Sequence, residues 1–177
     1  MTVNGLPRWT CRTHVDKVAS AGRLVIEPLA NLPVVKDLVA DMSPFFAKWQ
    51  KAEARFVPTS GRADPVAKID PASPQRLAAS AAIECINCAV CYAACDVVRW
   101  NPDYLGPAAL NRAWTLQNDV RDGGRDARLH AVAGDAGCHN CHSHQSCAAA
   151  CPNELNPTES IAGLKRLAAR AVLRGGL

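Results

Sequence analysis

The sequence predicts a mainly α-helical protein built around two sets of metal-binding cysteines, with a short β segment at its start. Nine cysteines occur in 177 residues. Most of them fall into two runs, at residues 85 to 95 and 138 to 151. From Ser73 onward, short segments with helical spacing alternate with these cysteine-containing loops. A chain of this length is expected to form one or two small domains.

Residues 1 to 30 predict β structure. Asn4-Gly5, between two apolar residues, is the signal of a two-residue hairpin turn. Leu24-Val25-Ile26 is a further β-forming stretch that ends near Pro28. Two or three strands are only marginally stable on their own, so this segment is expected to need a partner.

Residues 33 to 57 predict helix, because their apolar residues recur at helical spacing. These residues are Val34, Val35, Leu38, Val39 and Met42. Ser43-Pro44 either caps a second helix or kinks a single one. Four prolines between Val57 and Pro74 predict a linker or surface loop.

Two later dipeptides predict helix starts. Gly106-Pro107 opens one helix and Asn156-Pro157 opens the last. The last helix is expected to bury one apolar face and to turn its basic side chains elsewhere. The apolar face consists of Ile161, Leu164, Ala168 and Val172, and the basic residues are Lys165, Arg166 and Arg170.

Composition excludes several classes of protein. The start of the chain lacks the apolar segment of a signal peptide, so spaced cysteines predict metal ligands rather than disulfides. The most apolar stretch, Leu77 to Val98, is interrupted by charged residues and cysteines, which argues against a transmembrane helix. The formal charge of +4 is mild, and the basic residues are scattered, so no nucleic-acid partner is expected.

The strongest signal is the spacing C-x2-C-x2-C-x3-C at residues 85 to 95. This spacing is typical of cubane-type iron–sulfur clusters, in which the fourth cysteine turns away to ligate another cluster. The second run ends in C-x3-C-P at residues 147 to 152, which mirrors the end of the first. Zinc is the alternative, but zinc sites favour pairs of C-x2-C ligands. The pattern therefore indicates two clusters with crossed ligands.

Further residues show a resemblance to a known family. They are Cys85 to Cys95, Trp100 to Ala109, Cys141-x5-Cys147-x3-Cys151-Pro152, Glu27 to Pro33 and Lys36 to Met42. Taken in order, they resemble the iron–sulfur subunit of succinate dehydrogenase and fumarate reductase over nearly the whole chain. The resemblance implies a helical two-cluster ferredoxin domain at residues 31 to 177, preceded at residues 1 to 30 by a remnant of a plant-type ferredoxin domain.

The resemblance also implies the ligand sets. It assigns a 4Fe–4S cluster to Cys85, Cys88, Cys91 and Cys151, and a 3Fe–4S cluster to Cys95, Cys141 and Cys147. Two more side chains match family positions near a quinone, His142 and Trp100. The alternatives are a packed aromatic role for Trp100 and a hydrogen bond from His142 to a cluster sulfur.

By this resemblance, the chain carries electrons and has no catalytic residues of its own. A flavoprotein (FAD) subunit delivers electrons from succinate, the 4Fe–4S and 3Fe–4S clusters pass them on, and quinone accepts them beside membrane-anchor subunits. The expected location is peripheral, on the cytoplasmic face of the inner membrane. Succinate oxidation and fumarate reduction share this subunit, and Trp100 only tilts the expectation towards oxidation.

The chain departs from the family at its start, where most of the 2Fe–2S ferredoxin domain is missing. Residues 6 to 13 resemble the segment with the last cysteine of that cluster, which makes Cys11 an orphan ligand or a free thiol. A 2Fe–2S cluster needs four ligands and is expected only if the missing part is supplied. A late start, a broken gene or a split subunit would each explain this, and the first is favoured.

Three smaller departures lie near the clusters. Asp96 replaces the usual proline after Cys95, either placing a carboxylate near the quinone or remaining a solvated or capping residue. His144 stands where a C-x2-C-x2-C run would place a ligand, and imidazole can bind iron. Cys138 is extra and is expected to be a spare thiol rather than a ligand.

Two rival functions remain open at this stage. One is a two-cluster subunit of a heterodisulfide-reductase-like or glycerol-3-phosphate dehydrogenase-like complex, which shares the helical core. The other is an unassembled fragment or a zinc-bound interaction module. The Trp100 to Ala109 stretch, the asymmetric second run and the β remnant argue against the first rival.

Overall fold

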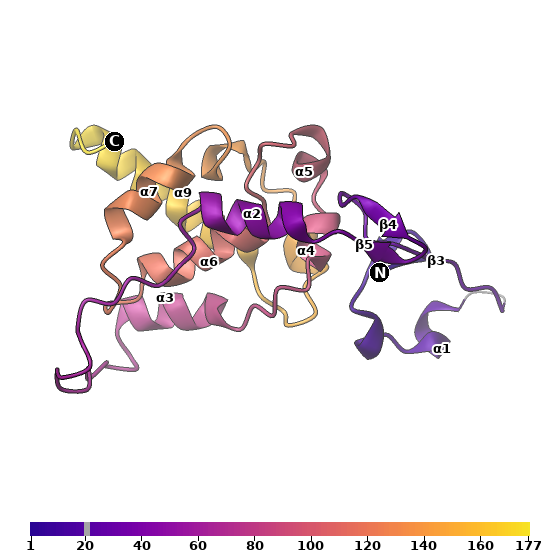
Figure 1. Ribbon diagram of the computed structural model, residues 1–177, viewed down its shortest axis with the longest axis horizontal. Helices are drawn as coiled ribbons and strands as arrows, with labels where there is room; N and C mark the ends of the chain where they lie inside the picture. Colours follow the sequence, from indigo (N-terminus) through magenta and orange to yellow (C-terminus); the bar gives the residue numbers. More distant parts are fainter. Residues whose placement is uncertain (20–21) are drawn as a thin grey trace.

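The computed structural model describes residues 1–19 and 22–177 and consists of a small β part beside a larger helical part (Figure 1). The chain starts in a sheet of order β2-β1-β3, made of β1 (Thr2–Val3), β2 (Leu6–Pro7) and β3 (Ile26–Glu27). Both pairings are antiparallel. Between β2 and β3 lie a 3-10 helix at Thr10–Arg12 and α1 (Val15–Val18).

The predicted hairpin turn is confirmed. Asn4 and Gly5 link β1 to β2 with φ angles of 49° and 77°, and positive φ at both central residues defines the turn type that Asn-Gly favours. The sheet leaves apolar side chains in solvent, including Leu6 and Ile26. Exposed apolar residues at the edge of such a small sheet are consistent with a β part that needs a partner.

The predicted helix at residues 33 to 57 is wrong in its first half. Residues 34 to 40 form a hairpin of β4 (Val34–Lys36) and β5 (Val39–Ala40), turning at Asp37 with φ of 50°. Its valines are exposed, so their helical spacing marks no buried face. Valine is stiff at χ1 and fits a pleated strand better than a helix.

The second half of that segment does form a helix, α2 (Ser43–Lys51). Proline stands in its first turn, where its missing N–H costs nothing. Ser43-Pro44 therefore opens a separate helix, and the single kinked helix is wrong. The predicted loop from Val57 to Pro74 is confirmed, with one isolated bridge between Pro58 and Asp122.

The helical part follows the prediction of short helices around cysteine loops. Its elements are α3 (Pro74–Ile83), α4 (Val90–Ala93), α5 (Asp96–Trp100), α6 (Pro107–Gln117), α7 (Arg125–Ala133), a 3-10 helix at Cys138–Asn140, α8 (Ser146–Ala149) and α9 (Pro157–Leu173). Both predicted helix starts are confirmed. The Asn156 side chain accepts a hydrogen bond from the Glu159 N–H at 3.1 Å, which caps α9.

Helix α6 forms the centre of the core and packs against α3, α7 and α9. Gly163 permits the close crossing of α9, since a Cβ there would meet the Trp114 ring at 2.5 Å. A buried polar chain joins three helices: Ser160 Oγ lies 2.8 Å from Asn111 Oδ1, and Asn111 Nδ2 donates to Ala82 O at 2.9 Å. Such satisfied buried groups fix one arrangement of the helices.

The buried face of α9 is predicted correctly except at its end. Ile161, Leu164 and Ala168 are buried, but Val172 is 60 % exposed. The last turn of α9 projects past its neighbours at the end of the helical part (Figure 1). Helical spacing shows which face is apolar, but it does not show where the neighbouring helices stop.

Another anchor ties α7 to the loop before it. Arg128 is fully buried and pairs with Asp122, with 3.0 Å between nitrogen and oxygen. Its guanidinium also donates to the carbonyls of Glu53 and Arg55. Because a buried charge needs partners, this residue holds α7 and the end of α2 in register.

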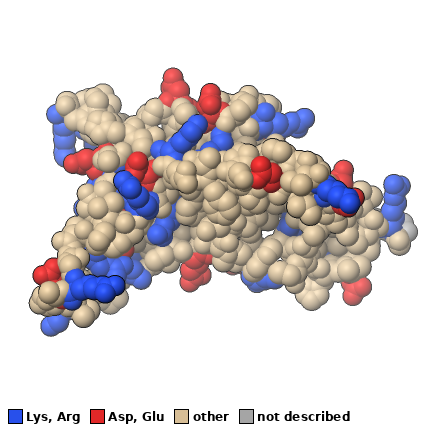
Figure 2. All heavy atoms as spheres, in the orientation of Figure 1, with Lys and Arg blue, Asp and Glu red and all other residues tan. Residues whose placement is uncertain are grey.

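The surface carries charges of both signs. In the face shown in Figure 2, Lys and Arg side chains are interspersed with Asp and Glu rather than gathered into one stripe. Among the helices of residues 1–19 and 22–177, none has the length and apolar character needed to cross a membrane.

Candidate iron–sulfur centres

The first cysteine run wraps a hollow of about 400 Å³, a volume that includes space open to solvent. Cys85, Cys88 and Cys91 line it, and the fourth cysteine is Cys151 from the second run. The remaining wall includes small and apolar residues such as Ala108 and Leu155. The crossed ligand predicted from the spacing is therefore brought to this hollow.

The second hollow, of about 340 Å³, is lined by the other three predicted ligands. Cys141 and Cys147 come from the second run, and Cys95 comes from the end of the first. The two hollows adjoin, since neighbouring residues of the same two helices line them: Ala108 and Pro157 line the first, and Pro107 and Thr158 line the second. The structure thus brings together all seven cysteines that the sequence singled out.

The two runs share one backbone conformation. Asn87 and Ala89 have positive φ angles of 58° and 57°, and Ser143 and Gln145 have 58° and 63° at the matching positions. Each run then enters a one-turn helix, α4 or α8. Left-handed residues turn successive N–H groups inward, which suits an anionic group. None of these four residues is glycine, so the loops accept local strain to make this cradle.

The sulfur atoms are poorly solvated. Burial raises the pKa of the thiols of Cys85, Cys88, Cys95 and Cys147, and it raises that of Cys91 well above its ordinary value. Neighbouring cysteines add to the effect on Cys91. Hydrogen bonds oppose it: the Asn87 N–H does so for Cys85. Several thiolates packed this closely repel one another, so the donor set fits a cationic iron core.

Each hollow offers the cysteines of one cluster. Within residues 1–19 and 22–177, no three His, Cys, Asp or Glu side chains converge closely enough to hold a single metal ion. Two adjoining hollows with four and three cysteines match the donor sets of a four-iron and a three-iron cluster.

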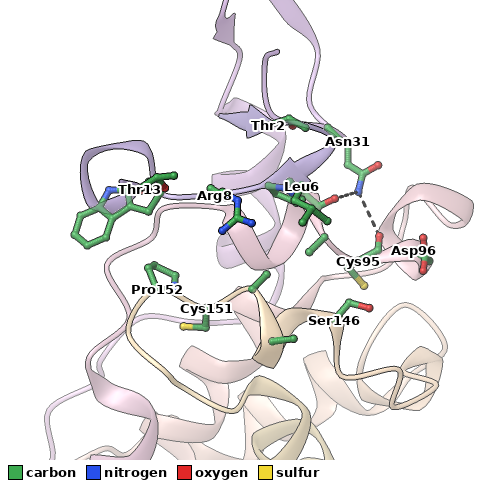
Figure 3. A pocket seen from close by; sticks show the side chains of 18 of the residues that line it. Thr2, Leu6, Arg8, Thr13, Asn31, Cys95, Asp96, Ser146, Cys151 and Pro152 are labelled. Atoms are coloured by element: carbon green, nitrogen blue, oxygen red, sulfur yellow. Dashed lines mark hydrogen bonds between the residues drawn. The ribbon is translucent and has the colours of Figure 1, made fainter. Parts of the chain in front are cut away.

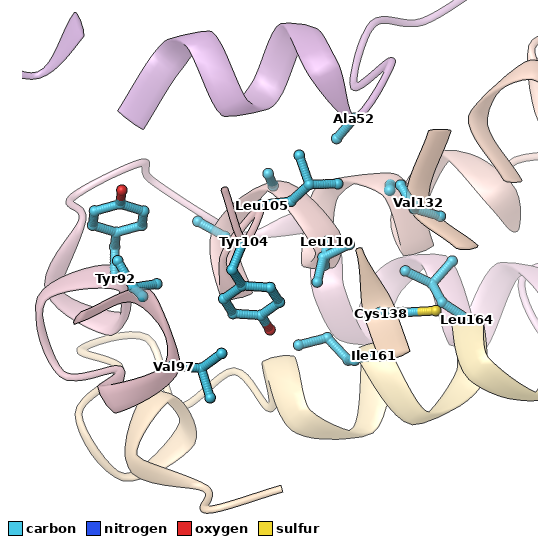
Figure 4. Close-up of a cluster of buried hydrophobic side chains, with 14 of the residues drawn as sticks. Ala52, Tyr92, Val97, Tyr104, Leu105, Leu110, Val132, Cys138, Ile161 and Leu164 are labelled. Atoms are coloured by element: carbon cyan, nitrogen blue, oxygen red, sulfur yellow. The ribbon is translucent and has the colours of Figure 1, made fainter. Parts of the chain in front are cut away.

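Two hydroxyl groups face the second hollow, and no sequence motif predicts either of them. Tyr104 is 1 % exposed, and its ring lies between Val97 and Ile161 (Figure 4). Burial and the cysteines Cys141, Cys95 and Cys147 raise the pKa of Tyr104, so its hydroxyl stays protonated as a donor. Thr158 Oγ1 lies 3.3 Å from Cys147 Sγ. Only folding brings either group to the cysteines.

Two exposed histidines, His142 and His144, line the second hollow, and Trp100 lies beside His144. The Trp100 and His144 ring centres are 6.4 Å apart, and those of His142 and His144 are 6.0 Å apart. Trp100 is 68 % exposed, so it is not the packed aromatic that was the alternative for it. The sequence predicts that Trp100 and His142 lie near the same quinone. The ring of His144 lies near both of them.

Side chains from other segments hold the runs in place. Asn31 Nδ2 donates to the carbonyls of Tyr92, Ala93 and Cys95 at 3.1 to 3.3 Å, and Figure 3 shows the bond to Cys95. Lys165 Nζ of α9 donates to Cys141 O at 2.6 Å. The two runs are therefore anchored differently, the first to the segment that follows β3 and the second to the last helix.

A wide, open hollow separates the β part from the cluster loops (Figure 3). Leu6 and Arg8 line one side, and Cys95, Asp96 and Pro152 line the other. Arg12 bridges part of it, donating to Pro152 O at 3.1 Å. Asp96 begins α5 and is exposed at the edge of both this hollow and the second cluster hollow.

The two remaining cysteines lie away from the cluster hollows. Cys138 is fully buried in the apolar core with Val132 and Leu164 and lines neither hollow (Figure 4). Its setting supports the prediction of a spare thiol. Cys11 is exposed in the short 3-10 helix of the β part.

Comparison with known proteins decides the family. Two family models match: a 2Fe–2S iron-sulfur cluster binding domain at residues 1–47 and a 4Fe–4S dicluster domain at residues 84–156. The fumarate reductase iron-sulfur subunit of Mycobacterium tuberculosis is 35 % identical over 178 residues, which cover 98 % of this chain and 70 % of that protein. The chain belongs to the succinate dehydrogenase and fumarate reductase iron–sulfur subunit family.

Other relatives agree with this family. The mitochondrial succinate dehydrogenase [ubiquinone] iron-sulfur subunit 1 of Oryza sativa is 33 % identical, over 94 % of this chain and 59 % of its own length. The chain thus spans about 59 to 70 % of these two relatives. A chain of the Mycobacterium smegmatis Sdh1 complex in the apo form shares the fold, with a TM-score of 0.78 at 23 % identity, covering 96 % of this chain and 71 % of that one.

Proposed function

We propose that this chain carries electrons from a flavoprotein (FAD) subunit through a 4Fe–4S and a 3Fe–4S cluster to quinone in a succinate:quinone oxidoreductase. One observation carries the proposal. The predicted ligands, far apart in sequence, line two adjoining hollows, and each hollow takes a cysteine from the run that serves the other. Crossed ligation of this kind sets two clusters close together, as stepwise electron transfer requires.

The two clusters are assigned by their donor sets. Cys85, Cys88, Cys91 and Cys151 provide four corners and hold the 4Fe–4S cluster. Cys95, Cys141 and Cys147 provide three corners and hold the 3Fe–4S cluster. When bound, the clusters supply the redox chemistry, and the protein supplies position, dryness and hydrogen bonds.

The chain's own residues set the conditions for transfer. The hydroxyl of Tyr104 stands ready to donate to the second cluster. Donors to a cluster favour its reduced, more negative state. Electrons are therefore expected to move from the first site towards the second. Beyond it, Trp100 and His142 contact the quinone.

The partners follow from this assignment. A flavoprotein subunit delivers electrons, membrane-anchor subunits hold the quinone, and the chain lies peripherally on the cytoplasmic face of the inner membrane. A 2Fe–2S cluster joins the relay only where the rest of its domain is supplied, because Cys11 offers one ligand of four.

The experiment is an iron and sulfide count with EPR on the chain purified without oxygen, together with an inventory of proteins that purify with it. We expect about seven irons per chain, four plus three, a 3Fe–4S signal when oxidised, and a flavoprotein as companion. Zinc in place of iron, or no metal at all, would overturn the proposal.

A further inference from the structure

The second cluster site has a fourth position that matches a cysteine of the first. Three positions spaced by three residues recur in the two runs, and their backbones share left-handed residues at the same two places. The matching positions are Cys85, Cys88 and Cys91 in the first run, and Cys141, His144 and Cys147 in the second. The backbone therefore presents His144 where the first run presents the ligand Cys88.

A second similarity supports this match. In each loop, the residue two positions beyond the first cysteine hydrogen-bonds to its sulfur. Ser143 N donates to Cys141 Sγ at 3.4 Å, and Cys85 Sγ lies 3.6 Å from the side-chain oxygen of Asn87. The two loops thus each hold their first cysteine through the same position, although by different atoms. What differs at the next ligand position is only the side chain, imidazole in place of thiol.

The His144 side chain is placed to reach the cluster. It lines the second hollow together with the three cysteines. It is exposed, and its ring centre lies 6.4 Å from that of Trp100 and 6.0 Å from that of His142. Among the hydrogen bonds of residues 1–19 and 22–177, none uses a nitrogen of His144. A neutral imidazole with a free nitrogen is a good ligand for iron.

We propose that His144 is the ligand of a fourth iron at the second site, so that a 3Fe–4S cluster held by Cys95, Cys141 and Cys147 takes up Fe²⁺ there and becomes a 4Fe–4S cluster. This rests on the proposed function, since it requires a cluster at that site. It gives the second centre two forms, selected by reduction and by the supply of iron.

The step balances with two named reagents. An external reductant such as dithionite gives one electron to the oxidised three-iron cluster. One Fe²⁺ then forms bonds to three sulfides of the cluster and to one nitrogen of His144, and no bond of the three cysteines breaks. Neutral imidazole binds through its unprotonated nitrogen and keeps its other N–H, so His144 releases no proton.

The test compares the wild-type chain, purified anaerobically with its clusters, with His144→Leu and His139→Leu. His139 is exposed and lines neither cluster hollow, so its variant controls for the loss of a histidine. Each protein is treated with dithionite and Fe²⁺, desalted, and measured by iron count and by EPR after mild oxidation. We expect the wild type and His139→Leu to gain about one iron per chain and to lose most of the three-iron signal. His144→Leu should gain no iron and should keep its three-iron signal.

Two further measurements keep the test decisive. His144→Cys places a thiolate at the matched position and should gain the iron at least as readily as the wild type. Pulsed EPR of the reduced wild type, with and without ¹⁵N-labelled histidine, should show a nitrogen bound to the second cluster, which needs no variant to fold. A wild type that already holds about eight irons as isolated, against about seven in His144→Leu, supports the proposal equally.

Failure of this inference can be told apart from failure of the proposed function. If the wild type and His144→Leu keep the same three-iron signal after Fe²⁺ and dithionite, and no histidine nitrogen couples to the cluster, His144 is not a ligand and the electron-carrying function stands. If no cluster signal and no iron appear in any variant, the proposed function falls, and this inference falls with it.

Discussion

The two cysteine runs share one backbone conformation, but the side chains around them differ. Asn87 and Ala89 in the first run and Ser143 and Gln145 in the second repeat the same left-handed turns. The first hollow has four cysteines, and no hydroxyl group lies among its described lining residues. The second has three cysteines, a buried tyrosine hydroxyl and two imidazoles at an exposed mouth.

This difference shows how a duplicated loop acquires two roles. The repeated backbone sets where ligands stand, and this part is common to both runs. The side chains that other elements bring to each hollow set its polarity and its access to solvent. Loop α5–α6 supplies Tyr104, and α9 supplies Thr158, to the second hollow only. The same cradle therefore carries two centres that meet different side-chain donors.

The largest expected effect tests the crossing of ligands between the runs. Cys151→Ser should abolish the first cluster, with a loss of about four irons, although Cys151 belongs to the second run. Cys95→Ser should instead abolish the second cluster and its three-iron EPR signal. The measurement is an iron count with EPR on both variants. Cys138→Ser serves as control, since Cys138 lines neither hollow and should leave both signals intact.

If the cysteines of each run ligated a single cluster, the variants would give the opposite pattern. Cys151→Ser would then remove the three-iron signal and spare the four-iron one. That result would overturn the assignment of both ligand sets.

The next effect concerns the metal-free chain at alkaline pH. Burial raises the folded-state pKa of the thiols of Cys85, Cys88, Cys91, Cys95 and Cys147. A raised pKa means that the unfolded chain loses these protons first. The stability they contribute is present below the ordinary thiol pKa and is lost as pH rises above it. The urea concentration at the midpoint of unfolding of the metal-free chain should therefore decrease as the pH is raised from about 7 to about 10.

The cluster-loaded chain is the control for this dependence. Its ligand sulfurs carry no proton in the folded state, so cluster binding releases protons and is favoured as pH rises. If the metal-free and loaded chains lose stability in parallel over this range, the buried thiols are not the cause.

A smaller effect tests the tyrosine hydroxyl that only the second hollow has. Tyr104→Phe removes the hydroxyl that faces Cys141, so the oxidised cluster is favoured and the midpoint potential of the second cluster should fall. A hydrogen bond to a charged group is worth roughly 1.5 kcal/mol, which is about 60 mV for one electron. Redox titration followed by EPR measures it.

Tyr92→Phe is the matched control for that titration. Tyr92 is also buried, but its ring packs edge-on against Phe45 of α2, and its hydroxyl points away from Tyr104 (Figure 4). Its variant should leave the potential of the second cluster nearly unchanged. Equal shifts in the two variants would mean that general loosening, and not the Tyr104 hydroxyl, sets the potential.

The smallest expected effect tests how the second run is anchored. Lys165→Met keeps the aliphatic stem in α9 but removes the hydrogen bond to Cys141 O. Because the side chain is half-buried, the loss should be about 1 kcal/mol in the free energy of unfolding. Urea unfolding of the loaded chain measures it, with Arg166→Met, an exposed neighbour, as control. The first run, held by Asn31, should keep its cluster.

The sequence by itself determined the features that depend on local spacing. Asn4-Gly5 specified its turn, because few dipeptides accept positive φ at both positions. Asn156-Pro157 specified the start of α9, through a side-chain cap and a proline without an N–H to satisfy. The cysteine spacings indicated two crossed ligand sets, since two-residue gaps turn successive thiols towards one centre.

Tertiary structure decided what depends on distant neighbours. The valines of residues 34 to 39 have helical spacing, yet they form a hairpin on the surface, because no helix face there meets the core. Val172 is apolar but lies beyond its neighbours. Only folding brings the hydroxyl of Tyr104 to Cys141 and the amide of Asn31 to the first run. Spacing sets which side chains share a face, whereas packing between distant segments sets what each face meets.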